Sequence, residues 1–145
     1  MNDQNISSAL LIYNRDYLLQ LRDFNEQISF PGMWGLFGGH IEKGETWERA
    51  LARELCEELG ISVTPSEYIG KIEIPGFQIH LGLVRLHGEF CSLDLREGQE
   101  IGVFSLKQIV EGRLVSKKYN KNYTLTPGCK AAFEFYQSLD RIEKE

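Results

Sequence analysis

The amino-acid sequence predicts one mixed α/β domain, in which helices pack against a mixed β-sheet. Short apolar runs alternate with turn residues, as in strands, and two segments carry helix signals, one in the middle of the chain and one near its end. The 145 residues, of which 42% are hydrophobic, suffice for one core and are too few for two full domains. Residues 1–145 are therefore expected to form a single domain.

The first elements are expected to be strands. Apolar or alternating residues at 9–13 and 17–22 flank an Asn-Arg-Asp turn, which predicts a hairpin. After a loop that contains a Pro-Gly pair, residues 34–37 form a short predicted strand that runs into Gly38 and Gly39. Without a Cβ atom, the backbone there can approach a ligand closely.

The strongest helix prediction covers residues 46–59. Thr46 is a suitable N-cap, and Gly60 is the usual residue for ending such a helix. Leucines recur every fourth position and predict one buried stripe: Leu51, Leu55 and Leu59.

The second half of the chain continues the mixed pattern. Strands are predicted at 68–74, 78–86 and 101–104, the first two separated by a Pro-Gly turn. Two further helices are predicted from their N-terminal signals, a Ser105 and Gln108 capping box and a Thr-Pro pair at 126–127. The last helix is expected to pack Ala131, Phe135 and Leu139.

Composition excludes several classes of function. A net charge of −5 argues against a stable complex with nucleic acid, since coating a phosphate backbone needs excess Lys and Arg. No run approaches the roughly 18 apolar residues of a membrane helix, and the N-terminus does not resemble a secretion signal. The three cysteines lie far apart without a CxxC pair, which favours inert thiols. We expect a cytoplasmic protein that does not bind membranes.

Three glutamates carry the main functional signal. Glu54, Glu57 and Glu58 stand at i, i+3 and i+4 of the predicted 46–59 helix, so their side chains share one face beside the leucine stripe. Like charges at this spacing destabilise a helix, whereas Mg²⁺ prefers carboxylate oxygens and shares its remaining positions with substrate phosphates. The alternative is a solvated acidic helix face.

The spacing of the neighbouring residues resembles a known motif. Gly39, five residues, Glu45, seven residues, Arg53-Glu54-Leu55, one residue, Glu57-Glu58, one residue and Gly60-Ile61 match the fixed positions of the Nudix box of MutT-like Nudix hydrolases. A match of this length is far more specific than a lone glycine motif. One departure is Phe37, where the family commonly has proline.

The resemblance implies an α/β/α sandwich around a mixed sheet and a set of roles. The expected activity is hydrolysis of a nucleoside diphosphate linked to a further group, with Mg²⁺ or Mn²⁺ as cofactor. Glu57 and Glu58 would be metal ligands, Glu54 a ligand or the general base, and the Gly38 carbonyl another ligand.

The remaining catalytic expectations concern Arg53, Glu45 and a later loop. Arg53 would orient the glutamates, and Glu45 would pair with it or brace the loop. Members of this family usually add an acidic residue from a later loop, for which Glu97 and Glu100 are the candidates here. Position favours Glu100 as a catalytic or metal-binding group.

The substrate is less well defined by the sequence. Arg22 could contact phosphate, Trp34, Phe77 or Tyr119 could stack on a base, and Asn120 or Asn122 could read a base edge. A small nucleotide-type substrate is expected, with nucleoside triphosphates such as 8-oxo-dGTP favoured. Nucleotide sugars, ADP-ribose and a non-catalytic nucleotide- or RNA-binding module stay open, as does a homodimer.

Overall fold

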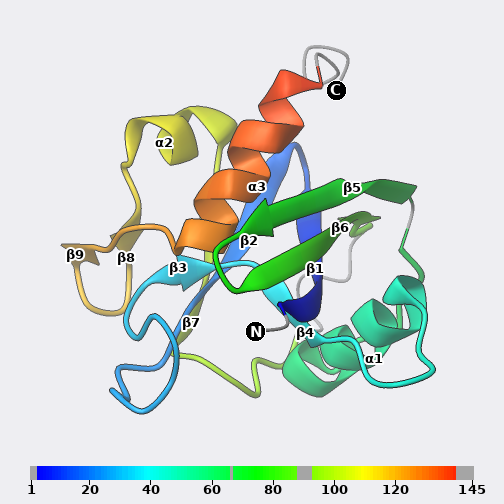
Figure 1. The fold of residues 1–145 in the computed structure, drawn as a ribbon. Coiled ribbons are helices and arrows are strands. Elements are labelled where there is room, and N and C mark those ends of the chain that lie inside the picture. Colours follow the sequence, from blue (N-terminus) through cyan, green and yellow to red (C-terminus); the bar gives the residue numbers. More distant parts are fainter. Residues whose placement is uncertain (1–2, 66, 88–92, 140–145) are drawn as a thin grey trace.

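The computed structural model describes residues 3–65, 67–87 and 93–139, and Figure 1 shows its ribbon. The strands are β1 (Gln4–Tyr13), β2 (Asp16–Leu21), β3 (Trp34–Gly35), β4 (Phe37–His40), β5 (Glu67–Ile74), β6 (Phe77–Arg85), β7 (Glu100–Phe104), β8 (Val115–Ser116) and β9 (Lys121–Asn122). The helices are α1 (Trp47–Leu59), α2 (Leu106–Glu111) and α3 (Pro127–Ser138).

Seven of these strands form one mixed sheet, as predicted. The strand order is β3-β2-β1-β6-β5, with β4 paired to β1 and β7 paired to β2. Only β1 and β6 run parallel among the described pairs, while the other pairs are antiparallel. The two short strands β8 and β9 form a separate antiparallel hairpin, which the sequence pattern did not predict.

The sheet splits between β1 and β2. These strands pair from Leu11↔Leu18 to the hairpin turn, but toward the other end β1 pairs with β4 and β2 pairs with β3. The short segment of β3 and β4 therefore enters between two diverging strands. This wedge places Gly38 opposite Ser8 of β1.

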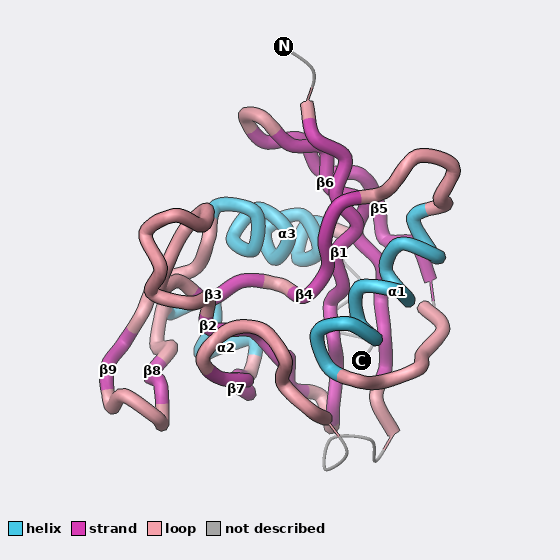
Figure 2. The backbone as a smooth tube through the Cα atoms, turned by 90° about the horizontal axis from the view of Figure 1, so that it is seen from below, coloured by secondary structure: helices cyan, strands magenta, loops and turns pink. Residues whose placement is uncertain are grey.

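Helices cover both faces of the sheet, and Figure 2 shows α1 and α3 on opposite sides of the strands. Side chains alternate along β1, so Leu10 packs in the core cluster on the α3 side, and Leu11 packs in the cluster on the α1 side. The expected α/β/α arrangement follows directly from this alternation. Leu51, Leu55 and Leu59 are fully buried, which confirms the stripe on the central helix.

The predicted face of the last helix is only partly correct, because Ala131 and Phe135 pack partly buried against the core but are not its most buried residues. Its buried residues are Cys129, Ala132, Phe133 and Tyr136, whereas Leu139 is 37% exposed. The most buried face includes Phe133, whose ring packs edge-on against Tyr17 of β2, with ring centroids 5.1 Å apart. The sequence spacing alone did not contain this contact between distant segments.

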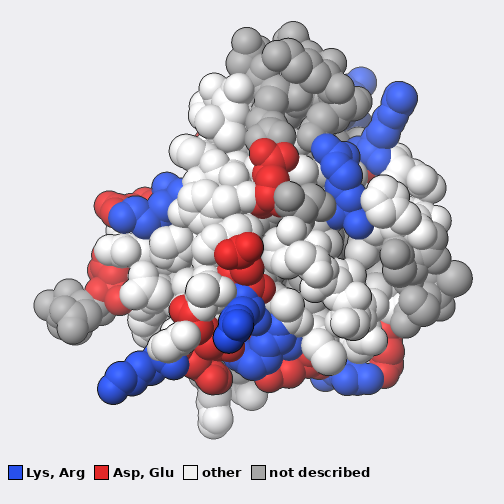
Figure 3. All heavy atoms as spheres, turned by 90° about the vertical axis from the view of Figure 1, so that its right-hand side faces the viewer, with Lys and Arg blue, Asp and Glu red and all other residues white. Residues whose placement is uncertain are grey.

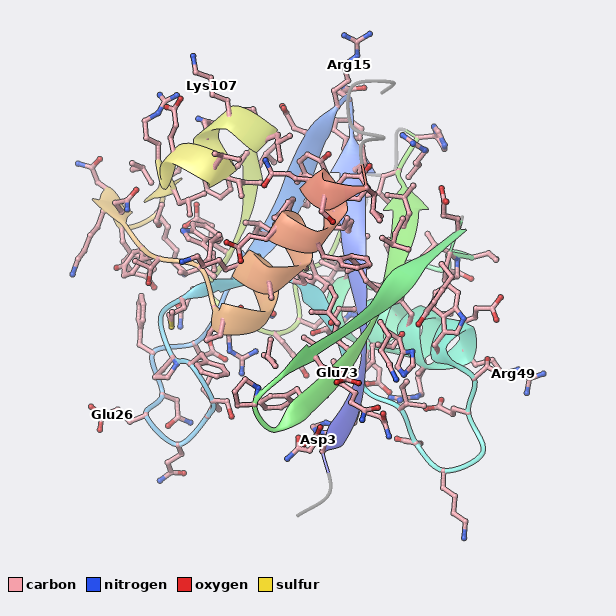
Figure 4. All side chains as sticks on the ribbon, turned by 45° about the horizontal axis from the view of Figure 1, so that its top comes forward. Asp3, Arg15, Glu26, Arg49, Glu73 and Lys107 are labelled. Carbon is pink, nitrogen blue, oxygen red and sulfur yellow. The ribbon has the colours of Figure 1, made fainter. Side chains whose placement is uncertain are left out.

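Several charged side chains extend into solvent. Arg15, Arg49 and Lys107 extend away from the body of the molecule in Figure 4. Within residues 3–65, 67–87 and 93–139, no helix has the length and apolar character needed to cross a membrane. Cys56 is exposed and Cys129 is buried, and both are free thiols, while Cys91 lies outside the described residues.

Candidate active site

Capping residues define both ends of helix α1. The Thr46 side chain accepts a hydrogen bond from the Arg49 backbone N–H, and Gly60 ends the helix with φ +68°, a backbone conformation that favours glycine. At the wedge, Gly38 has φ +143°, and a Cβ atom there would overlap the Ser7 carbonyl. A Cβ atom at Gly39 would overlap the Glu54 carboxyl group, so the missing side chain allows this close approach.

Glu58 is the most deeply buried of the acidic residues. Only 3% of it is exposed, and one carboxylate oxygen accepts a hydrogen bond of 2.9 Å from the Gly38 backbone N–H. Burial raises the pKa of Glu58 from 4.5 to about 8, although the hydrogen bond from Gly38 opposes this shift. A negative charge here is therefore unfavourable unless positive charge comes close.

Arg53 organises the other carboxylates. Its guanidinium donates to both Glu45 carboxylate oxygens, at 2.8 and 2.9 Å, and to Glu54 at 3.0 Å. It also donates to the His40 carbonyl at 3.0 Å, which ties α1 to β4. The expected pairing of Glu45 with Arg53 is present, and Glu45 also accepts from the Glu42 N–H and so braces the loop.

The Glu45 and Glu54 carboxyl groups respond differently to this arginine. The hydrogen bonds from Arg53 lower the pKa of Glu45 to about 2. Burial raises the pKa of Glu54, because its desolvation outweighs the contact with Arg53. Glu54 is thus the more suitable of the two to exchange a proton.

Glu57 lies at the edge of the site. Its side chain is 55% exposed and contacts Arg53 at 3.3 Å. Figure 3 views the molecule from the side that carries α1 and shows acidic and basic side chains intermixed on this face. Glu57 therefore belongs to the charged surface around Arg53, next to the more buried Glu54 and Glu58.

An open pocket of about 370 Å³ adjoins the acidic residues. Glu54, Glu58 and Glu97 line it together with the Gly38-Gly39 backbone. Apolar side chains from other strands line it as well, among them Ile6, Leu36, Ile74, Phe77 and Ile79. The pocket can thus hold a molecule with one polar or charged part and one apolar part.

The loop carboxylate that lines the pocket is Glu97, whereas Glu100, which its position in the sequence favoured, does not line it. Glu100 begins β7, and its side chain accepts hydrogen bonds from the Ser116 hydroxyl and the Lys117 N–H. Its strand position directs it to the β8 side of the sheet. Glu97 lies in the preceding loop, and its charge raises the pKa values of Glu54 and Glu58.

The predicted substrate contacts are only partly brought together. Arg22 and Phe77 line the pocket, and Arg22 donates to the Ser29 carbonyl at 2.8 Å. Trp34 is fully buried, and its indole N–H donates to the Leu114 carbonyl, so the proposal that it stacks on a base is wrong. Because Trp34 lies in β3, inside the sheet, its ring is not accessible to a base.

The residues considered from the β8–β9 region have other contacts. Asn120 takes φ +53° in the hairpin turn and lies outside the pocket lining, so its predicted role in substrate binding is not supported by its position. The Asn122 side chain accepts from the Leu114 N–H, and the Tyr119 hydroxyl donates to the Gln99 side chain. These contacts hold the hairpin against its neighbours.

The acidic side chains fit a hard divalent cation by their chemistry. In the described part of the chain, no three His, Cys, Asp or Glu side chains already converge in a metal-holding geometry. Carboxylates repel one another without a cation, and Arg53 draws Glu54 and Glu57 toward itself. Glu58 nevertheless combines burial with two acidic neighbours, and an all-oxygen donor set of this kind suits Mg²⁺ or Mn²⁺.

Comparisons with known proteins show which family the chain resembles. The NUDIX domain family matches residues 4–123. A CTP pyrophosphohydrolase of Escherichia coli (strain K12) is 40% identical over 78 residues, which are 52% of this chain and 58% of that protein. A nucleoside triphosphatase NudI of Enterobacter sp. (strain 638) is 43% identical over 60 residues, 41% of this chain and 42% of that protein. Both alignments span less than two thirds of the relatives.

Solved structures match almost the whole chain. The solution structure of the E. coli ORF135 protein is 28% identical, has a TM-score of 0.69, and is matched over 97% of this chain and 92% of that one. A MutT protein from Methanosarcina mazei Go1 has the same fold, with a TM-score of 0.71, 22% identity and coverage of 100% and 99%. With the family match over residues 4–123, and with Gly39, Glu54 and Glu58 of the predicted box lining one pocket, this chain belongs to the Nudix family.

Proposed function

We propose that this protein is a hydrolase that cleaves a phosphoanhydride bond of a nucleoside triphosphate, releasing a nucleoside monophosphate and pyrophosphate. The observation that carries the proposal is the pocket itself, in which Glu54, Glu58 and Glu97 adjoin an apolar wall. The names of two relatives, a CTP pyrophosphohydrolase and a nucleoside triphosphatase, support the same substrate class.

The roles of the charged groups follow from their surroundings. Glu54, Glu57, Glu58 and the Gly38 carbonyl would hold Mg²⁺ or Mn²⁺. Glu97 would add a further carboxylate at the acidic end of the pocket, which Glu54 and Glu58 line. A bound divalent cation supplies positive charge to the phosphate oxygens and makes a water molecule more acidic. Glu54, whose pKa is raised by burial, is suited to accept a proton from that water, and Arg53 holds its carboxylate in place.

The apolar residues would bind the base. Phe77 lies at the pocket with Ile74 and Ile79, so its ring can stack on a nucleobase. Arg22 lines the same pocket and brings a guanidinium for the phosphates. These assignments support a nucleotide and do not select one base.

The test is a substrate panel with the protein stripped of metal by EDTA and then supplied with Mg²⁺ or Mn²⁺. Nucleoside triphosphates, 8-oxo-dGTP, nucleotide sugars and ADP-ribose are compared by separating the nucleotide products and assaying pyrophosphate. We expect pyrophosphate from at least one nucleoside triphosphate and no reaction without metal. Turnover restricted to nucleotide sugars or ADP-ribose would replace the proposed substrate class, and binding without turnover would indicate a non-catalytic module.

Glu54→Gln and Glu48→Gln are a matched pair of variants for the same panel. Both residues lie on α1, but Glu54 lines the pocket and Glu48 is exposed in the first turn. Glu54→Gln is expected to reduce kcat by roughly 100-fold or more, in the range for removing a positioned proton acceptor. Glu48→Gln is expected to retain the wild-type rate.

A further inference from the structure

Gln20 is a buried polar residue in the leucine-rich strand β2. At this position, β2 pairs on its two sides with β3 and β7. The strand is otherwise rich in leucine, and only 4% of Gln20 is exposed. A buried amide without hydrogen bonds is strongly unfavourable, so this glutamine needs a specific partner.

That partner is the backbone of the loop that carries Glu97. The Gln20 amide nitrogen donates a hydrogen bond of 2.9 Å to the Glu97 carbonyl oxygen. The contact joins residues 77 positions apart in the sequence. Because a carbonyl can only accept, the amide nitrogen must face the loop, and Gln20 therefore fixes the backbone from which the Glu97 side chain extends.

The residues next to Glu97 are anchored as well. The Arg96 N–H donates to the Glu58 carbonyl on α1 at 2.8 Å, and the Gln99 N–H donates to the Leu21 carbonyl on β2 at 2.7 Å. The loop is thus attached to the helix on one side and to the sheet on the other. Gln20 supplies the side-chain attachment at Glu97 itself.

Gly98 makes the contact sterically possible. It takes φ +84°, and a Cβ atom there would come within 2.8 Å of the Gln20 amide nitrogen and of the Leu21 carbonyl oxygen. Such contacts are too short, so a side chain at this position would displace the amide. The contact between Gln20 and the Glu97 carbonyl therefore depends on the absence of a side chain at Gly98.

We propose that Gln20 is a positioning residue that holds Glu97 at the acidic end of the pocket, through its hydrogen bond to the Glu97 carbonyl. This inference rests on the proposed function, in which Glu97 works together with Glu54 and Glu58. Gln20 itself does not line the pocket and acts through the loop.

The test compares Gln20→Met, which keeps the length of the side chain and removes the donor, with Glu97→Gln and with the double variant. Each single variant is expected to lower kcat roughly 10- to 100-fold with KM near the wild-type value, as for other groups that orient a site. If Gln20 acts through Glu97, the double variant has about the same kcat as Glu97→Gln alone.

The matched control is Gln108→Met. Gln108 also bonds a backbone group with its side chain, the Ser105 N–H in the capping box of α2, but it does not line the pocket. It is expected to lower Tm without changing kcat. Should Gln20→Met not fold, Gly98→Ala disturbs the same contact from the loop side and is expected to show the same loss of kcat.

Hydrogen exchange gives a readout that needs neither metal nor nucleotide. In ¹⁵N-labelled protein, Gln20→Met is expected to speed exchange at the amides of Arg96 and Gln99 and to leave β1 and β6 unchanged. Unchanged exchange and wild-type kcat in Gln20→Met would overturn the inference, as would a double variant that loses the product of both single effects. Faster exchange in a protein that hydrolyses no nucleotide would retain the placement of Glu97 by Gln20 and reject the proposed function.

Discussion

The carboxylate of Glu58 lies where folding alone does not favour a negative charge. Burial raises its pKa to about 8 and the charges of Glu54 and Glu97 add to this, which outweighs the opposing effects of the Gly38 N–H and the Arg22 guanidinium. Protein sites of this kind are retained at the expense of stability when they serve binding or catalysis. We therefore expect the ionised Glu58 carboxylate to lower the free energy of unfolding of the metal-free protein.

The raised pKa predicts a pH-dependent effect of Glu58→Gln in EDTA. Because the folded-state pKa lies above 4.5, Glu58 stabilises the fold fully below about pH 4.5, and this contribution is lost as the pH rises through about 8. The uncharged glutamine should make the metal-free protein more stable than wild type at pH 9, by on the order of a few kcal/mol, with a smaller difference at pH 5.

Thermal unfolding at the two pH values measures the effect. Glu48→Gln, an exposed substitution on the same helix, serves as the control and is expected to change Tm little at either pH. A Glu58→Gln variant that is less stable than wild type at pH 9 would show that the buried carboxylate does not destabilise the metal-free protein.

The contacts of Arg53 lead to a prediction about the catalytic rate. Its guanidinium holds Glu45 with two hydrogen bonds and reaches Glu54 and the His40 carbonyl, which a lysine cannot reproduce. Arg53→Lys is expected to lower kcat by roughly 10- to 100-fold with a smaller change in KM.

Arg49→Lys is the control for this measurement. Arg49 lies on the same helix and points into solvent (Figure 4), so its replacement should leave steady-state kinetics unchanged. Equal kinetics for Arg53→Lys and wild type would mean that the bidentate contact does not orient the site.

At the residue scale, the sequence predicted the box glutamates and the arginine pairing, because a fixed spacing on one helix determines which side chains are neighbours. It did not distinguish Glu97, which lines the pocket, from Glu100, which does not. That distinction depends on where β7 begins and on the Gln20 contact from a distant strand. The polar Gln20 within a leucine-rich strand was the available signal.

At the scale of elements, the caps and the leucine stripe made α1 predictable. Thr46, Gly60 and three leucines act locally, so their effect is contained in the segment itself. The orientation of α3 was not predictable in this way. It depends on Tyr17, which packs edge-on against both Phe133 and Tyr136.

The orientation of α3 predicts which of its apolar residues stabilise the fold. Phe133→Ala removes a side chain that is 3% exposed and is expected to lower the free energy of unfolding by about 3–5 kcal/mol. Leu139→Ala, at a position that is 37% exposed, is expected to have an effect below about 1 kcal/mol. Urea unfolding followed by circular dichroism measures both, and equal effects would contradict the observed face.

At the scale of the whole molecule, the split between β1 and β2 connects fold and function. The wedge of β3 and β4 brings the Gly38-Gly39 backbone to α1, while the continuing sheet supplies the apolar side of the pocket. Alternating strands and helices predicted the layers. The split itself depends on long-range pairing that no local pattern encodes.

The central claim is that this pocket gathers carboxylates to hold divalent cations beside a nucleotide. Crystals soaked in Mn²⁺ and measured near the manganese absorption edge would locate the ions directly. We expect anomalous peaks at bonding distance from carboxylate oxygens of Glu54 and Glu58, next to Gly38. Peaks found only at surface carboxylates, with Glu54 and Glu58 unliganded at saturating Mn²⁺, would contradict it.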